Sequence, residues 1–121
     1  VKLLIKKGNN VKKSKALILG ITFKENCTDT RNSRVIDIYL ELQQFGVDIE
    51  VYDPHANKEE VYKEHKIELI EELNDKYDSI ILAVSHAEFL HLDYHKLKKS
   101  EKAVIFDTKS VLDRNSVDAR L

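Results

Sequence analysis

Short hydrophobic segments recur along the chain, and each has the length of a β-strand. Several are nearly continuous runs of apolar side chains, which is typical of strands covered on both faces of a sheet. Gly20 ends the first run, and Asp53 with Pro54 ends the second. Strands are predicted at residues 16–19, 47–52, 79–84 and 103–106, with a short edge strand at 67–70.

Helical patterns lie between these segments. Residues 33–45 carry apolar side chains at helical spacing, and Gly46 closes the predicted helix. Its predicted buried face consists of Val35, Ile36, Tyr39, Leu42 and Phe45. A charged surface helix is predicted at 57–65, and short helical turns are predicted at 87–89 and 94–97.

The alternation of strands and helices indicates the α/β fold class. Right-handed crossovers between parallel strands place helices on both faces of a sheet. We therefore expect a Rossmann-like three-layer domain with a mainly parallel sheet of about five strands. Residues 1–5 resemble a helix end that Lys6, Lys7 and Gly8 would terminate, and a polar connector follows. A chain that opens in this way is expected to be a piece of a longer protein.

Composition narrows the class of protein. With 42% hydrophobic and 34% charged residues among 121, the chain is expected to form one globular domain. The net charge of −1 gives no electrostatic argument for binding nucleic acid or an anionic membrane. The apolar runs are too short to span a bilayer. A single cysteine excludes an internal disulfide and fits the reducing cytoplasm, where we expect the protein to be located.

Polar residues follow each predicted strand, and parallel strands bring their carboxyl ends to one edge of the sheet. The segments that would meet there are 22–31, 53–55, 85–86 and 107–109. Ligands of open α/β sheets bind at this edge. Lys24 and Arg31 are the strongest candidates, because two cations beside a helix start suit a phosphorylated ligand. Lys109 is a third. The alternative is that they are solvated surface cations, or that Arg31 pairs with Asp29.

Other chemistry has weaker support. Cys27 would need an adjacent base or cation to become a nucleophile, and no sequence feature places a histidine there. His91 and His95 have i, i+4 spacing but lack the glutamate of a metalloprotease motif, so no metal site is predicted. His86 ends a strand, where it could bind a ligand or serve a structural role.

A dinucleotide-binding fingerprint is missing. Gly20 is the single glycine at the first strand-to-helix turn, and Phe23 and Lys24 stand where a Gly-x-Gly-x-x-Gly run would continue. We therefore expect that this domain does not hold NAD alone.

Residues 20–33, G-I-T-F-K-E-N-C-T-D-T-R-N-S, strongly resemble the C-terminal domain signature of the UDP-glucose/GDP-mannose dehydrogenase family, G-[FLI]-[AST]-F-K followed by D-x-R-x-S. The likeness continues in V-Y-D-P at 51–54, in residues 78–84 and in F-D-T-K at 106–109. By this resemblance, residues 1–14 correspond to the end of a central helix and a connector. Residues 15–121 correspond to the UDP-sugar-binding C-terminal domain.

The resemblance implies an NAD-dependent enzyme that oxidises the C6 hydroxyl of a nucleotide-sugar to a carboxylate for polysaccharide synthesis. The Glu-Asn-Cys-x-Asp form of the loop is most like UDP-N-acetylhexosamine 6-dehydrogenases. Phe23, Lys24 and, less closely, Lys109 match substrate-binding positions, and Arg31 matches a position that reaches NAD on the N-terminal domain. The family's nucleophilic cysteine lies upstream of this chain and Cys27 does not match it, so no catalytic residue is predicted here. The resemblance also implies that the full-length enzyme is a homodimer.

Two further hypotheses belong to other classes. A stand-alone nucleotide-binding or regulatory module would bind UDP-sugars without other domains and without catalysis. A response-regulator-like domain would use Asp53, which follows a strand, as its phosphorylation site. Pro54 directly after it, and the lack of an acidic pair at the end of the first strand, count against that hypothesis.

Overall fold

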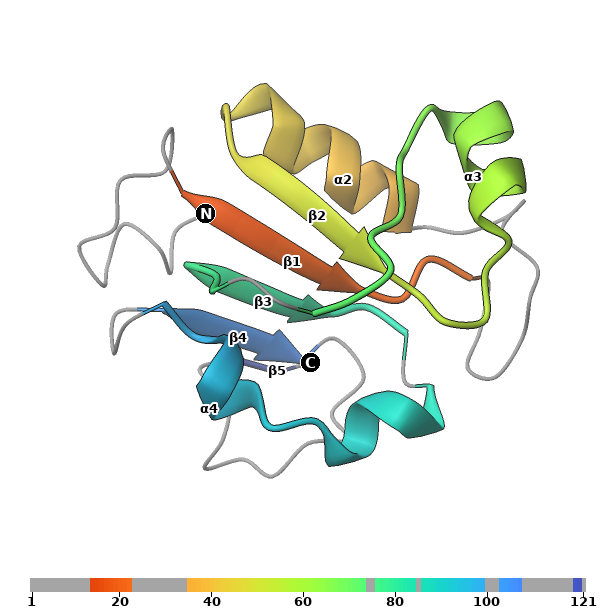
Figure 1. Cartoon of the computed structure of the whole chain (residues 1–121). Coiled ribbons are helices and arrows are strands. Elements are labelled where there is room, and N and C mark those ends of the chain that lie inside the picture. Colours follow the sequence, from red (N-terminus) through yellow and green to blue (C-terminus); the bar gives the residue numbers. More distant parts are fainter. Residues whose placement is uncertain are drawn as a thin grey trace.

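The computed structural model describes residues 14–22, 35–73, 76–84, 86–99, 103–107 and 119–120. Within them, five strands form one parallel sheet in the order β2-β1-β3-β4-β5 (Figure 1). The strands are β1 (Lys15–Leu19), β2 (Asp48–Tyr52), β3 (Ser79–Leu82), β4 (Val104–Asp107) and β5 (Ala119–Arg120). The predicted α/β class and parallel sheet are confirmed.

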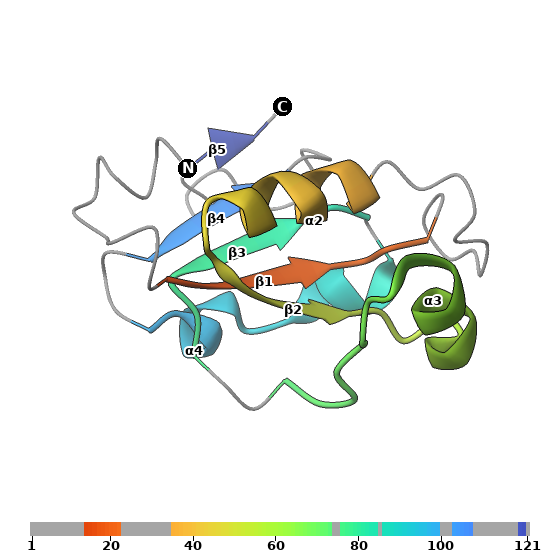
Figure 2. The same ribbon diagram turned by 90° about the horizontal axis from the view of Figure 1, so that it is seen from above.

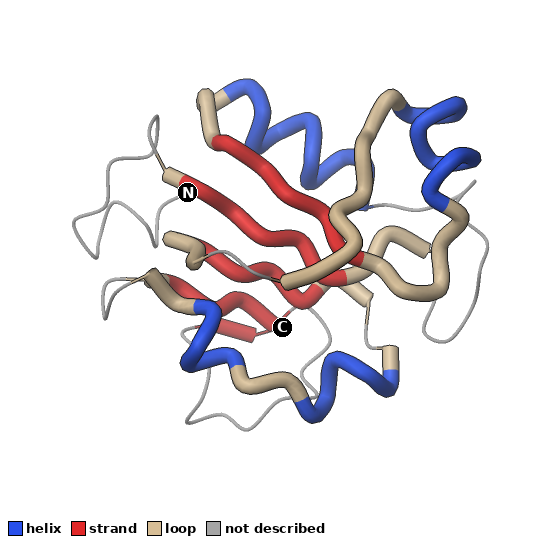
Figure 3. Tube along the Cα trace, viewed as in Figure 1, coloured by secondary structure: helices blue, strands red, loops and turns tan. Residues whose placement is uncertain are grey.

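Helices cover both faces of this sheet, as the view from above shows (Figure 2). Helix α2 lies on one face, and the 3-10 helix η2 and the short helix α4 lie on the other. The helices are α2 (Val35–Gln44), α3 (Lys58–His65), η2 (Ala87–His91) and α4 (Tyr94–Leu97). Figure 3 traces the resulting alternation of strands and helices along the described chain. The predicted three layers are therefore present.

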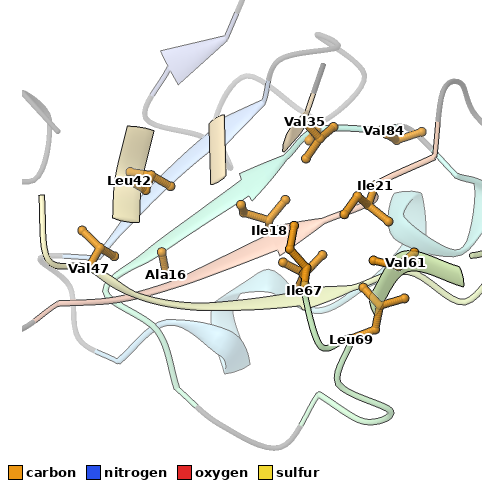
Figure 4. Close-up of a cluster of buried hydrophobic side chains, with 12 residues drawn as sticks. Ala16, Ile18, Ile21, Val35, Leu42, Val47, Val61, Ile67, Leu69 and Val84 are labelled. Atoms are coloured by element: carbon orange, nitrogen blue, oxygen red, sulfur yellow. The ribbon is translucent and has the colours of Figure 1, made fainter. Parts of the chain in front are cut away.

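Strand β1 is central because alternate side chains point into two separate cores. Ala16 and Ile18 join the core beneath α2 and α3, which Figure 4 shows. Leu17 and Leu19 join the opposite core with residues of η2 and α4. All four side chains are fully buried. This two-sided burial explains the continuous apolar run in the sequence.

Three predicted details differ from the structure. Phe45 was expected on the buried face of α2, yet it is 45% exposed, because the helix ends at Gln44 and Gly46 turns the chain with a φ of +77°. The expected edge strand at 67–70 is reduced to one bridge between Leu69 and Val51. Ala119–Arg120, for which no strand was predicted, pairs with β4.

The strand order creates a topological switch point beside β1. The chain passes from β1 outward to β2 and then back across the sheet to β3, so β1 and β3 are neighbours whose connections leave in opposite directions. Such a switch point is where open α/β sheets bind ligands, beyond the carboxyl ends of the strands. The residues that follow β1, β2 and β3 form the base of this position.

Candidate ligand-binding site at the carboxyl ends of the strands

The strongest sequence candidates lie outside the described residues. These are the predicted substrate-binding residues Phe23, Lys24 and Lys109, and the predicted NAD contact Arg31. Cys27 also lies outside them. Their roles therefore remain predictions. The described part of the site is the set of residues that directly follow the first three strands.

Asp53 joins the ends of β1 and β2. Its Oδ2 atom accepts hydrogen bonds from the backbone amides of Ile21 at 2.7 Å and Thr22 at 3.2 Å. Its Oδ1 atom accepts from the amides of His55 at 2.8 Å and Ala56 at 3.2 Å. The Asp53 side chain therefore fixes both the turn that starts at Asp53 and the beginning of the loop after β1.

His86 brings the end of β3 into the same arrangement. Its Nε2 atom lies 3.0 Å from Asp53 Oδ2 and 3.0 Å from Thr22 Oγ1. A carboxylate can only accept, so Nε2 carries a proton and donates it to Asp53. Thr22, Asp53 and His86 are each at most 5% exposed. We call these three residues the rim cluster, which links the ends of three neighbouring strands.

The rim cluster keeps Asp53 ionised. Burial raises the pKa of this carboxyl, but hydrogen bonds from His86 and from the amides of Ile21 and His55 together lower the pKa by more than burial raises it. The net result is a pKa below the ordinary value for aspartate. A buried negative charge is tolerated here because several donors converge on it.

The rim cluster does not have the geometry of a catalytic triad. In a triad, the histidine uses one ring nitrogen for the acid and the other for the hydroxyl. Here the same Nε2 atom faces both Asp53 and Thr22. The burial of all three side chains also leaves them without direct access to a ligand. The arrangement positions backbone segments. For His86, it supports the structural role.

A second, more exposed pair, His55 and Glu88, lies next to the rim cluster. The ring of His55 packs against that of His86, with centroids 4.3 Å apart. His55 Nε2 lies 2.9 Å from the carboxylate of Glu88, whose pKa this hydrogen bond lowers. The side chains of His55 and Glu88 are 26% and 48% exposed. The sequence does not predict this pair, because 33 positions separate its members and no local pattern connects them.

Two features distinguish this strand-to-helix turn from that of a dinucleotide-binding domain. Gly20 has a φ of +96°, and a Cβ there would lie 2.5 Å from Cβ of Val84. This glycine therefore serves the close approach of the segment after β3. In dinucleotide-binding domains an Asp or Glu about 20 residues after the glycine-rich turn binds a ribose hydroxyl. Asp53, at the end of β2, is instead enclosed by protein donors.

The described residues contain no group of three His, Cys, Asp or Glu side chains that could hold a metal ion. None of the helices in this part of the chain has both the length and the apolar composition needed to cross a membrane.

The burial of Asp53 counts against the response-regulator hypothesis. A phosphorylation site would have to be exposed, whereas the carboxylate of Asp53 is buried.

Comparisons with known proteins identify the class of domain. Residues 17–114 match the UDP-glucose/GDP-mannose dehydrogenase family, UDP binding domain. The chain belongs to this family.

Individual relatives agree with this assignment. The whole chain is 41% identical to UDP-N-acetyl-D-glucosamine 6-dehydrogenase of Salmonella typhi and 38% identical to that of Pseudomonas aeruginosa. It spans 29% of the length of each. A UDP-N-acetyl-mannosamine dehydrogenase structure from Staphylococcus aureus, Cap5O, matches 93% of this chain and 26% of its own, with a TM-score of 0.68 and 27% identity. A UDP-D-ManNAc dehydrogenase from Pyrococcus horikoshii shares the fold at a TM-score of 0.78 and 20% identity, over 98% of this chain and 28% of that one.

Proposed function

We propose that this chain is the UDP-sugar-binding domain of an NAD-dependent nucleotide-sugar 6-dehydrogenase that acts in polysaccharide precursor synthesis. The family match over residues 17–114 carries the proposal. The relatives from Salmonella typhi and Pseudomonas aeruginosa are named UDP-N-acetyl-D-glucosamine 6-dehydrogenase, and a UDP-N-acetylhexosamine is therefore the proposed substrate. The full enzyme would convert the C6 hydroxyl of the sugar to a carboxylate and work as a homodimer in the cytoplasm.

The proposed ligand contacts follow the rim cluster in sequence. Phe23 and Lys24 come directly after Thr22, and both match substrate positions of the family. Lys109 would add a cation after β4. Lysine offers a point charge to a diphosphate, whereas the planar guanidinium of Arg31 suits bidentate contact with a phosphate of NAD. The ordered ends of β1 to β3 support these roles, because they give the loops a fixed base at the switch point.

NAD would be bound mainly by a separate N-terminal domain. The described residues do not fit NAD in the Rossmann manner, because Asp53 is occupied by backbone amides and His86. The nucleophilic cysteine would also lie in that other part of the enzyme. Residues 1–14 would be the end of the central helix and its connector, and residues 15–121 the UDP-sugar-binding domain. The contribution of this domain is to bind and orient the substrate, without a catalytic residue of its own.

A domain replacement tests the proposal. The 121 residues would replace their counterpart in the Salmonella typhi relative, and NADH formation would be measured with a panel of UDP-sugars. We expect the hybrid to oxidise UDP-N-acetylhexosamines and the isolated chain to have no dehydrogenase activity. Robust turnover by the isolated chain would refute the proposal. A folded hybrid that binds UDP but forms no NADH with any sugar would favour a stand-alone binding module.

A further inference from the structure

Two buried aspartates hold opposite ends of the same strand. At the carboxyl end, Asp53 Oδ2 accepts the amide of Ile21 at 2.7 Å. At the amino end, Asp78 Oδ2 accepts the amide of Lys15 at 2.8 Å. The two residues are 5% and 8% exposed. β1 is thus fixed at both ends by the same kind of contact, and only one of these ends faces the proposed ligand.

The contact at the carboxyl end controls the direction in which the chain leaves the sheet. Gly20 is the last residue whose amide bonds to the neighbouring strand β2, through the carbonyl of Tyr52 at 2.9 Å. The next two amides, of Ile21 and Thr22, bond to the side chain of Asp53. A carboxylate is thus the partner that determines where these two residues lie. Hydrogen bonds to a charged acceptor are among the stronger ones in proteins.

We propose that Asp53 is a positioning residue for UDP binding, because it fixes the backbone of residues 21–22 from which the ligand-contacting loop begins. This inference rests on the proposed function. Phe23 and Lys24, the proposed ligand contacts, directly follow these two residues in the sequence. In enzymes, a misplacement of about 1 Å caused by a remote mutation can reduce the reaction rate about a hundredfold. Asp53 itself does not touch the ligand, because its carboxylate is enclosed.

His86 acts as the support of this residue. It donates to the Oδ2 atom that also accepts both loop amides, so it limits the movement of that atom. Its ring lies near those of His55 and Phe89, with centroid distances of 4.3 Å and 5.4 Å. The side chain is fully buried, and close packing leaves the imidazole little room to rotate. The carboxylate is consequently held by a side chain that is itself fixed.

Asp53→Asn and Asp78→Asn form a matched pair of variants for the test. Each replaces one accepting carboxylate oxygen by a donating NH2 group and removes the charge, at opposite ends of β1. Both oxygens of Asp53 accept backbone amides, so an asparagine there loses contacts in either orientation, whereas its carbonyl oxygen can still accept the Lys15 amide at position 78. The hybrid enzyme described above would be titrated with UDP by calorimetry, and the free energy of unfolding of the 121-residue chain would be measured in urea. We expect both variants to lose stability. We expect Asp53→Asn to weaken UDP binding about tenfold or more and Asp78→Asn to leave it within about twofold.

The outcomes separate the inference from the proposed function. Equal affinities in the unchanged chain and in Asp53→Asn, or equal losses in both variants, would overturn the positioning role and leave the UDP site in place. No UDP binding by a folded hybrid enzyme that carries the unchanged chain would overturn the proposed function and the inference with it. If Asp53→Asn does not fold, Asp53→Glu moves the carboxylate by one methylene. A similar loss is expected for it, and unchanged affinity would contradict the inference.

Discussion

Gly20 and Val84 approach each other so closely that no side chain fits between them. A Cβ on Gly20 would lie 2.5 Å from Cβ of Val84 and 3.0 Å from its backbone nitrogen. The two residues follow β1 and β3, the strands on either side of the switch point. Gly20, which stands where a dinucleotide fingerprint would begin, is therefore required for packing of the polypeptide itself.

Gly20→Ala is expected to destabilise the fold. The substitution places a Cβ against Val84 and a non-glycine residue at a φ of +96°. Overpacking and left-handed backbone strain together should lower the free energy of unfolding by about 2 kcal/mol or more. Gly46→Ala is the comparison, because Gly46 also has a positive φ of +77°. Urea denaturation of both variants should show the larger loss for Gly20→Ala, and a Gly20→Ala chain as stable as the original would contradict the packing role.

Acid should weaken the fold through Asp53. Its pKa is lower in the folded chain than the ordinary value, so its carboxylate stabilises the fold above the unfolded pKa of about 3.9. That contribution is lost as the pH falls through the lower, folded value. Asp53→Asn should be less stable near pH 7 by roughly 1.5–3 kcal/mol. The difference between the two chains should narrow below about pH 4 in urea denaturation. A constant difference from pH 3 to about pH 7 would argue against an ionised, buried Asp53.

Tyr94→Phe tests the layer opposite α2. The Tyr94 hydroxyl donates to the carbonyl of Phe89 at 2.5 Å and thereby connects α4 to η2. Removal of a buried hydrogen bond should lower the free energy of unfolding by about 1–2 kcal/mol at neutral pH. Tyr62→Phe is a suitable control, since Tyr62 is 48% exposed and should tolerate the change. Equal stability of the Tyr94 and Tyr62 variants would show that the buried contact contributes nothing.

The same tyrosine should make the fold sensitive to alkali. Burial, and secondarily the charge of Asp107, raises the pKa of Tyr94 above its ordinary value of 10.0. The neutral hydroxyl is therefore favoured in the folded chain, and its contribution is complete below about pH 10 and declines above it. The stability difference between the original chain and Tyr94→Phe should shrink as the pH rises above about 10. Urea denaturation at several alkaline pH values measures this, and a difference that grows would be inconsistent with the raised pKa.

Lys24→Ala and Arg31→Ala should separate the two proposed ligand contacts. In the hybrid enzyme, Lys24→Ala is expected to weaken use of the UDP-sugar, and Arg31→Ala to weaken use of NAD or domain closure. Loss of a charge-assisted contact should change the affected constant about tenfold to a hundredfold. Steady-state kinetics with each substrate varied in turn distinguishes these effects. If neither variant changes the kinetics, both residues are ordinary surface cations.

Most of the sheet could be predicted because strands buried on both faces leave a strong local pattern. β1 is the clearest case, since each of its apolar residues enters one of two cores. β5 could not be predicted in this way, because a two-residue strand carries no periodicity. Phe45 was misplaced because helical spacing alone does not reveal that the helix ends one residue earlier.

The site was predictable to the extent that strand ends converge. The sequence places Thr22, Asp53 and His86 after three different strands, and a parallel sheet brings such residues together. The individual contacts were not predictable, because Asp53 after a strand can equally be an exposed functional acid or an enclosed structural one. Only the structure distinguishes these roles, through the four amides and the imidazole around its carboxylate.

The location of UDP on the chain can be measured directly. The 121-residue chain labelled with ¹⁵N would be titrated with UDP while its backbone amide signals are recorded. We expect saturable shifts for the amides of Thr22, His55 and His86 at the carboxyl ends of the strands. We expect the amides of Lys15 and Tyr77, at the opposite end of the sheet, to remain unchanged. Shifts confined to the opposite end of the sheet would contradict a UDP site at the carboxyl ends of the strands.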